Sequence, residues 1–163
     1  MTESSLTILS DFDNTVVHEN VAQLLAQHFS SLDVEECRQR YRNREITFKE
    51  YQEIIFSGVS ASQIVLKQYA RQHTTVREGF IELVNYCKKH KIGFNIVTLG
   101  LDFYVAAILE ECKLSDIPLF AVNTQFTSRG IEYSYPHTTP ECASWGNCKC
   151  VTLVKYRHEG KKF

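Results

Sequence analysis

A short apolar strand that runs into two aspartates is the feature that most constrains the fold of this chain. The segment LTILSDFDNTVV, residues 6–17, starts with the β-prone run Leu6–Ser10 and continues with Asp11 and Asp13. A buried carboxylate without a partner is costly, so both aspartates should follow the strand at a place where something neutralises them. Residues two apart in an extended segment project to the same side. We therefore expect both carboxylates to face one ligand.

The pattern after this strand divides the chain into two parts. Residues 20–73 show only helical spacing of apolar residues, and Asp33, Thr47 and Ser60 are placed to cap the second, third and fourth helices. Beyond them, strands and helices alternate. The predicted elements are a helix at 77–90, a strand at 92–98, a helix at 102–112, a strand at 117–126 with a hairpin partner at 129–135, a loop at 137–150 and a helix at 150–158.

This alternation predicts an α/β fold with a parallel sheet and right-handed crossovers. In such sheets ligands bind beyond the carboxyl ends of the strands. Asp11 and Asp13 follow the first strand and Thr98 ends the next, so the three should meet. Two neighbouring carboxylates repel unless a cation neutralises them, and hard oxygen ligands favour Mg²⁺. One carboxylate can then attack phosphorus while the other moves the proton of the leaving group.

Composition narrows the class of protein further. The 163 residues suit one domain with at most a small second lobe, and 44% hydrophobic residues allow a packed core. Eighteen basic and 19 acidic residues give a net charge of -1, which offers no reason to expect a nucleic-acid partner. The start of the chain lacks a secretory signal, and no apolar run reaches the ~18 residues of a membrane span. We expect a soluble, cytoplasmic protein with reduced cysteines and no membrane partner.

Three short motifs, in order along the chain, carry a resemblance to a known family. The segment DFDNT resembles motif I, D-x-D-x-T, of the haloacid dehalogenase (HAD) superfamily of phosphatases. The segment VTLG resembles its motif II, and GNCKC supplies a lysine, Lys149, where motif III is placed. The stretch REGFIELVNYCKKHKIGFNIVTLGLDFYV is particularly similar to the branch of 2-hydroxy-3-keto-5-methylthiopentenyl-1-phosphate phosphatases, of which phosphoserine phosphatases are near relatives.

The resemblance implies a fold, a cofactor and a substrate class. It implies a Rossmann-like HAD core with a parallel sheet, built from residues 1–17 and 76–163, and a helical C1-type cap at residues 18–75. It implies an Mg²⁺-dependent hydrolase, a phosphomonoesterase that acts on a small phosphorylated metabolite.

The resemblance also implies catalytic roles. Asp11 would be the nucleophile that forms an aspartyl-phosphate, and it would also bind Mg²⁺. Asp13 would be the general acid and base, with its backbone carbonyl on the metal. Lys149 would neutralise charge on Asp11 and on the phosphate in the transition state.

Further residues would bind the substrate. Thr98, with backbone amides near Leu99 and Gly100, would hold the phosphoryl oxygens. Glu19 could face the substrate from the entrance of the cap. Ile55 stands where phosphoserine phosphatases carry a carboxylate-binding arginine, which argues against phosphoserine as the substrate.

The family's fourth motif is an acidic pair on the strand after motif III. After Lys149 the sequence continues CVTLVKYRHEGKKF, whose one acidic residue is Glu159. We therefore expect a C-terminally truncated core that lacks motif IV and has the first strand at an open edge. Such an edge invites a homodimer. The alternative function is a catalytically inactive HAD-like remnant that acts as a binding or interaction protein.

A zinc-stabilised module is a further alternative. Cys142, Cys148 and Cys150 cluster near the end of the chain, with His137 or His158 as a possible fourth ligand. A C-x-C pair with one distant cysteine lacks the doubled spacing of a structural zinc site, so this reading is the weaker one.

Overall fold

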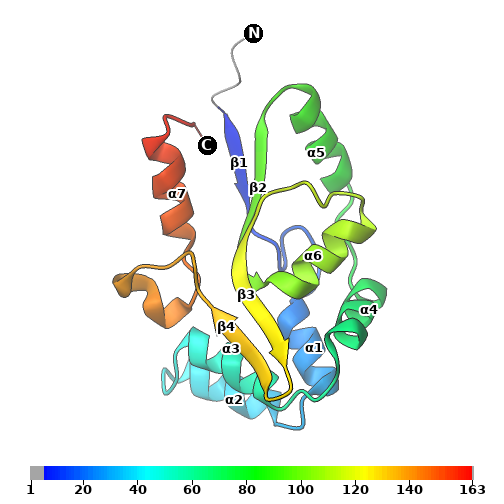
Figure 1. Cartoon of the computed structure of the whole chain (residues 1–163), viewed down its shortest axis with the longest axis vertical. Coiled ribbons are helices and arrows are strands. Elements are labelled where there is room, and N and C mark those ends of the chain that lie inside the picture. The colour runs from blue at the N-terminus through cyan, green and yellow to red at the C-terminus, as the bar shows by residue number, and fades with distance from the viewer. Residues whose placement is uncertain (1–5, 163) are drawn as a thin grey trace.

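A four-stranded sheet forms the centre of the computed structural model, which describes residues 6–162 (Figure 1). The strand order is β1-β2-β3-β4. Strands β1 (Thr7–Ser10), β2 (Gly93–Leu101) and β3 (Leu119–Thr127) run parallel, and β4 (Gly130–Ser134) pairs with β3 in an antiparallel hairpin. The predicted α/β class and the predicted hairpin are confirmed.

Four helices come from the segment between the first two strands. They are α1 (Val21–Phe29), α2 (Val34–Arg42), α3 (Phe48–Ser57) and α4 (Gln63–His73), and Figure 1 shows them beyond the carboxyl ends of the parallel strands. The chain enters and leaves this segment at adjacent points, because Val17 and Val76 form an antiparallel bridge. The His18 N–H also donates to the Thr75 carbonyl at 3.0 Å.

The starts of these helices follow from their capping residues. Asp33 accepts from the N–H groups of Glu35 and Glu36, and Thr47 forms a reciprocal capping box with Glu50, as predicted. The prediction of Ser60 as the fourth cap is wrong. Ser62 caps α4 instead, through the Val65 N–H, because the helix begins only after Ala61 has packed against the core.

Helices cover both faces of the sheet (Figure 1). Helices α5 (Phe80–Lys89) and α6 (Asp102–Glu111) lie on one side; α7 (Lys149–His158) and the short 3₁₀ helix η1 (Pro140–Trp145) lie on the other. Helix α6 is buried on nearly all sides. Even Tyr104 is fully buried, so this helix lacks the exposed polar face that an amphipathic surface helix has.

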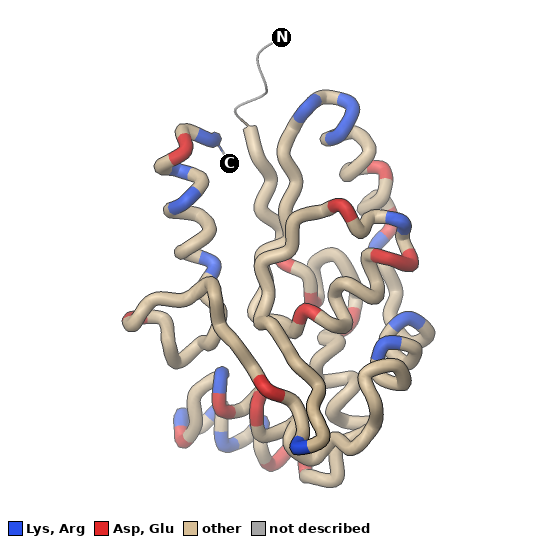
Figure 2. Tube along the Cα trace, viewed as in Figure 1, with Lys and Arg blue, Asp and Glu red and all other residues tan. Residues whose placement is uncertain are grey.

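Strand β1 is the outermost strand of the sheet formed by residues 6–162, as predicted. At the start of β1, Lys162 forms a parallel bridge with Leu6. The Lys162 carbonyl also accepts a hydrogen bond from the Thr7 N–H at 2.7 Å. Basic and acidic residues are interspersed over most of the fold (Figure 2). No helix within residues 6–162 has both the length and the apolarity needed to cross a bilayer.

Candidate active site

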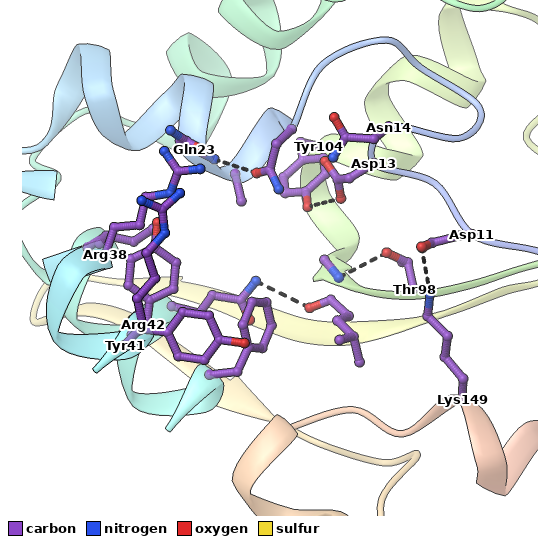
Figure 3. Close-up of a pocket in the computed structure, with 18 residues that line it drawn as sticks. Asp11, Asp13, Asn14, Gln23, Arg38, Tyr41, Arg42, Thr98, Tyr104 and Lys149 are labelled. Carbon is purple, nitrogen blue, oxygen red and sulfur yellow. Dashed lines mark hydrogen bonds and ion pairs between the residues drawn. The ribbon is translucent and has the colours of Figure 1, made fainter. Parts of the chain in front are cut away.

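A cavity of about 350 Å³ lies between the carboxyl ends of the strands and helices α1–α3. Its lining contains all but one of the site residues predicted from sequence: Asp11, Asp13, Thr98, Leu99, Gly100 and Lys149. Helices α1, α2 and α3 supply the opposite wall (Figure 3). Segments almost 140 residues apart in sequence therefore share one cleft.

Asp11 presents its carboxylate to this cavity directly after β1. Its Oδ1 accepts a hydrogen bond from the Phe12 N–H at 2.8 Å, and its Oδ2 lies 2.6 Å from the Lys149 Nζ. Phe12 is fully buried, so it anchors the turn that carries the carboxylate. The Asp11 side chain keeps 38% of its surface exposed. The group is held in place and is still reachable from the cavity.

Asp13 is held more tightly than Asp11. Its Oδ1 accepts from the Val21 N–H at the start of α1 at 2.7 Å, and its Oδ2 accepts from the Tyr104 hydroxyl at 2.8 Å. Burial raises the pKa of Asp13 from 3.8 to about 6; the Val21 and Tyr104 hydrogen bonds oppose that rise, and the Asp11 carboxylate adds to it. A carboxyl group with this pKa can give and take a proton near neutral pH.

Gly100 leaves the room that this arrangement needs. A Cβ atom at this position would lie 2.8 Å from Asp13 Oδ2 and would overlap the Tyr104 hydroxyl. Neither atom belongs to a flexible chain end, since Tyr104 is fully buried. Glycine is therefore required here by the close approach of the Asp13–Tyr104 pair.

Thr98 lies inside β2 and not at its end, which corrects the predicted strand boundary. The five residues of β2 from Val97 to Leu101 lie against only three residues of β3, from Phe120 to Val122, which marks a bulge. Within the bulge the Thr98 Oγ1 accepts from the Gly100 N–H at 3.0 Å. The strand continues because its C-terminal residues still pair with β3, while the bulge turns the Thr98 region toward the cavity.

Lys149 is the first residue of α7, one residue earlier than predicted. The residue two before it, Asn147, is buried and donates from Nδ2 to the Thr98 carbonyl at 3.2 Å. The start of α7 is thereby tied to the bulge of β2. This tie positions the lysine ammonium beside Asp11.

Glu19 lies elsewhere. It does not line the cavity; its Oε2 accepts a hydrogen bond from the Thr75 N–H at 2.8 Å, where the chain returns from the helical segment. The predicted contact between Glu19 and a substrate is therefore not supported. The sequence pattern does not reveal that the backbone N–H of Thr75 is the hydrogen-bond donor to Glu19.

The cysteine cluster does not form a metal site. Within residues 6–162 no group of three or more His, Cys, Asp or Glu side chains is arranged to hold a metal ion. Cys142 and Cys148 hydrogen-bond to each other through their thiols, and all six cysteines are free. The geometry gives the zinc alternative no support.

Sequence reasoning missed several residues of the cavity. Tyr104 reads as a core residue of an apolar helix, and nothing in its spacing reveals its bond to Asp13. Gln52 of α3 donates to the Leu99 carbonyl at 3.2 Å and links the helical segment to the β2 bulge. Arg38 and Arg42 line the far wall, and their four-residue spacing on one helix was the available signal.

Comparison with known proteins gives both sequence and structural relatives. No family model matches the chain. A 2-hydroxy-3-keto-5-methylthiopentenyl-1-phosphate phosphatase of Brevibacillus brevis is 25% identical over 158 residues, which cover 94% of this chain and 70% of that protein. The phosphatase of the same name from Exiguobacterium sibiricum is 28% identical over 167 residues, covering 96% and 73%.

Solved structures agree with this fold. A HAD family hydrolase from Salmonella enterica serovar Typhi matches with a TM-score of 0.75 at 14% identity, over 98% of this chain and about half, 53%, of that chain. A phospho-aspartyl intermediate analogue of phosphoserine phosphatase matches with a TM-score of 0.69 at 20% identity, over 98% and 74%.

The chain shares its fold with solved structures of a haloacid dehalogenase family hydrolase and of phosphoserine phosphatase. In sequence the chain is similar to curated 2-hydroxy-3-keto-5-methylthiopentenyl-1-phosphate phosphatases, as the resemblance of its motifs predicted.

Proposed function

We propose that this chain is an Mg²⁺-dependent phosphomonoesterase that hydrolyses a small phosphorylated metabolite through an aspartyl-phosphate on Asp11. The observation that carries the proposal is the convergence of two carboxylates and a lysine on one cavity. Asp11 and Lys149 are in contact at 2.6 Å, and Asp13 lies at the same strand end with a pKa raised to about 6 by burial.

The different environments of Asp11 and Asp13 suit these carboxylates to different catalytic roles. A carboxylate oxygen of Asp11 attacks the phosphorus atom, and the bond from phosphorus to the ester oxygen breaks. Protonated Asp13 gives its proton to the departing alkoxide, and the alcohol leaves. The Asp13 carboxylate then takes a proton from water as the water oxygen attacks the aspartyl-phosphate. Inorganic phosphate and the free Asp11 carboxylate are the products.

Lys149 and the Thr98 hydroxyl are the fixed positive and polar groups for this chemistry. The ammonium of Lys149 offsets the charge that develops on the phosphoryl oxygens and on Asp11. The Thr98 hydroxyl accepts from Gly100 and keeps its own hydrogen for a phosphoryl oxygen. The backbone amides near Leu99 and Gly100 complete the phosphoryl subsite in this proposal.

The donor set at the strand end fits a hard divalent cation. Both carboxylate oxygens of Asp13 already accept hydrogen bonds, so its backbone carbonyl is the donor it would offer. Oδ1 of Asp11 accepts one N–H and has a second lone pair. Asp11 and Asp13 would hold Mg²⁺ through these oxygen atoms. The bound ion would supply positive charge against the phosphoryl oxygens.

The helical segment suits the role of a cap over this cavity. We propose a core of residues 1–17 and 76–163 and a cap of residues 18–75, joined where Val17 and Val76 form an antiparallel bridge. Contacts that tie the two parts include the Gln52 bond to the Leu99 carbonyl and the bond from the Tyr135 hydroxyl to Glu53 Oε1 at 2.6 Å. Closing the cap would exclude bulk water from the phosphoryl group.

The substrate of the curated relatives is the first candidate to assay. Ile55, in place of the arginine of phosphoserine phosphatases, lines the cavity and leaves no cation at that position. Phosphoserine is therefore expected to be a poor substrate.

Phosphate release from a panel of phosphomonoesters, with and without Mg²⁺, tests the proposal. Asp11→Asn should abolish turnover, since it removes the nucleophile without changing the shape of the side chain. Asp116→Asn is the matched control, because Asp116 pairs with Lys88 on the surface, away from the cavity. Turnover that survives Asp11→Asn, or that Asp116→Asn reduces equally, would overturn the assignment of the nucleophile.

One observation favours a second role for the same chain. Strand β1 is the outermost strand of the described sheet, and such edges pair with other chains. A catalytically inactive protein that associates with a second copy through β1 would explain this edge. Light scattering decides: a monomer across the concentration range argues against it, and a dimer without phosphatase activity favours it.

A further inference from the structure

The wall of the cavity opposite Asp11 carries two arginines of the cap. Arg38 and Arg42 lie one helical turn apart on α2 and both line the cavity. Figure 3 shows them across the cavity from Asp11, Thr98 and Lys149. Two like charges at this spacing repel each other and destabilise a helix. An anion between them therefore stabilises their placement on one face.

The protein supplies only part of that negative charge. Glu35 is the one acidic residue paired with both arginines; its two carboxylate oxygens lie 3.4 Å from Arg38 Nη1 and 3.9 Å from Arg42 Nη1. Glu35 does not line the cavity, and the acidic residues that do, Asp11 and Asp13, belong to the core wall. Two cations thus share one carboxylate behind them, so the cavity side of the pair is positive.

The Asp11 carboxylate does not compensate for this imbalance, because its charge is matched by Lys149. The positive charge at the far wall is therefore separate from the positive charge at the phosphoryl end. The side chains of Arg38 and Arg42 are 34% and 53% exposed, so both remain able to reach a ligand.

Aromatic side chains of the cap surround the arginine pair. Tyr41 and Tyr51 are stacked with ring centroids 5.6 Å apart, and the ring of Phe48 lies 5.7 Å from that of Tyr41. All three line the cavity. An ion pair beside such a surface is screened less by water than one in bulk solvent. The cavity thus has an aromatic middle between two ends that carry cationic side chains.

We infer that Arg38 and Arg42 bind a second anionic group of the substrate, at the end of the molecule opposite the phosphate. The ligand class is a small phosphomonoester with a terminal carboxylate or a second phosphate. Planar guanidinium groups bind either anion through paired N–H bonds. The inference rests on the proposed function, since it takes the Asp11 end as the phosphoryl site.

A matched series of substrates tests the inference. The probes are ω-phosphonooxy carboxylates with two to five methylene groups, their neutral methyl esters, and bisphosphates of the same lengths. We expect KM of the best carboxylate or bisphosphate to be 10- to 100-fold lower than that of the neutral ester, as for hydrogen bonds to a charged group at about 1.5–3 kcal/mol. Whichever charged series has the lower KM identifies the anion. Equal KM values for acids and esters would overturn the inference.

Variants locate the effect. Arg38→Gln and Arg42→Gln should each remove most of the KM advantage that the charged probes have over their neutral esters. Arg40→Gln is the matched control, because Arg40 is on the same helix but pairs with Glu45 at 3.8 Å and does not line the cavity. An equal loss in Arg40→Gln would show a general charge effect and would contradict the site.

Calorimetric binding separates this inference from the proposed function. The corresponding phosphonates, which cannot be hydrolysed as esters, are titrated with and without the terminal carboxylate. Tighter binding of the carboxylate form that is lost in Arg42→Gln supports the anion site even if no ester is turned over. In that case only the hydrolase proposal fails. Binding that ignores the terminal charge contradicts the anion site whether or not the chain is a phosphatase.

Discussion

Removing one hydroxyl group should change the protonation of Asp13 in a measurable way. Tyr104 is fully buried and its hydroxyl donates to Asp13 Oδ2 at 2.8 Å. In Tyr104→Phe that oxygen loses its donor, while the Val21 N–H still serves Oδ1. A hydrogen bond to a charged group contributes about 1.5–3 kcal/mol, and 1.36 kcal/mol corresponds to one pH unit in a pKa. The pKa of Asp13 should therefore rise from about 6 by roughly one to two pH units.

The consequence for stability has a definite sign. The folded protein holds the Asp13 proton more tightly than the unfolded chain, whose value is near 3.8, so the free energy of unfolding decreases as pH rises from about 4 to about 6. In the wild type this decrease is about 3 kcal/mol. In Tyr104→Phe the decrease continues to higher pH, so the variant should lose about 1.5–3 kcal/mol more than the wild type between pH 5 and pH 8.

Urea denaturation at pH 5 and pH 8 measures this difference. Tyr156→Phe is the matched control, because its hydroxyl donates to Asn95, a group that does not titrate, at 3.1 Å. Its loss of stability should be the same at both pH values. A Tyr104→Phe loss that is independent of pH would refute the account of Asp13. An alkaline limb of kcat/KM that stays at the wild-type pH would refute its role in proton transfer.

Three further substitutions test the geometry of the site and the capping of α3. Gly100→Ala should destabilise the fold by about 1–3 kcal/mol, because the added Cβ overlaps Tyr104 and Asp13; unchanged urea denaturation would contradict the close approach. Lys149→Gln should lower kcat by about 10²–10³-fold with little change in the free energy of unfolding, since the ammonium acts on developing charge; unchanged kcat would remove it from the site. Thr47→Ala should cost about 1 kcal/mol of stability through the capping box, and thermal unfolding should show no loss if the box contributes nothing.

The convergence of the site residues could be predicted because topology enforces it. Strands that alternate with helices form a parallel sheet, and the carboxyl ends of β1 and β2 must then lie together. That argument brings Asp11, Asp13 and Thr98 to one place without any knowledge of side-chain contacts. The helix starts at Asp33 and Thr47 could also be predicted, because the side-chain oxygens of these residues accept hydrogen bonds from backbone N–H groups in the next turn.

The errors arise where tertiary contacts decide. The strand pattern could not reveal that β2 passes through a bulge at Thr98 and continues to Leu101, because pairing with β3 determines it. Glu19 bonds to Thr75, a residue 56 positions away. Helical spacing alone would place Leu83 on the inner face of α5, yet it is 43% exposed, because Phe80, Val84 and Cys87 form the face that packs on the sheet.

The most direct test of the central claim is to trap the phosphorylated enzyme. Brief incubation with a labelled phosphomonoester and Mg²⁺, followed by acid quenching and peptide mapping, should place one labile phosphoryl group on Asp11 in the wild type. The label should be absent in Asp11→Asn and present in Asp116→Asn. A phosphoryl group mapped to any other residue, or turnover without any trapped intermediate on Asp11, would contradict the account.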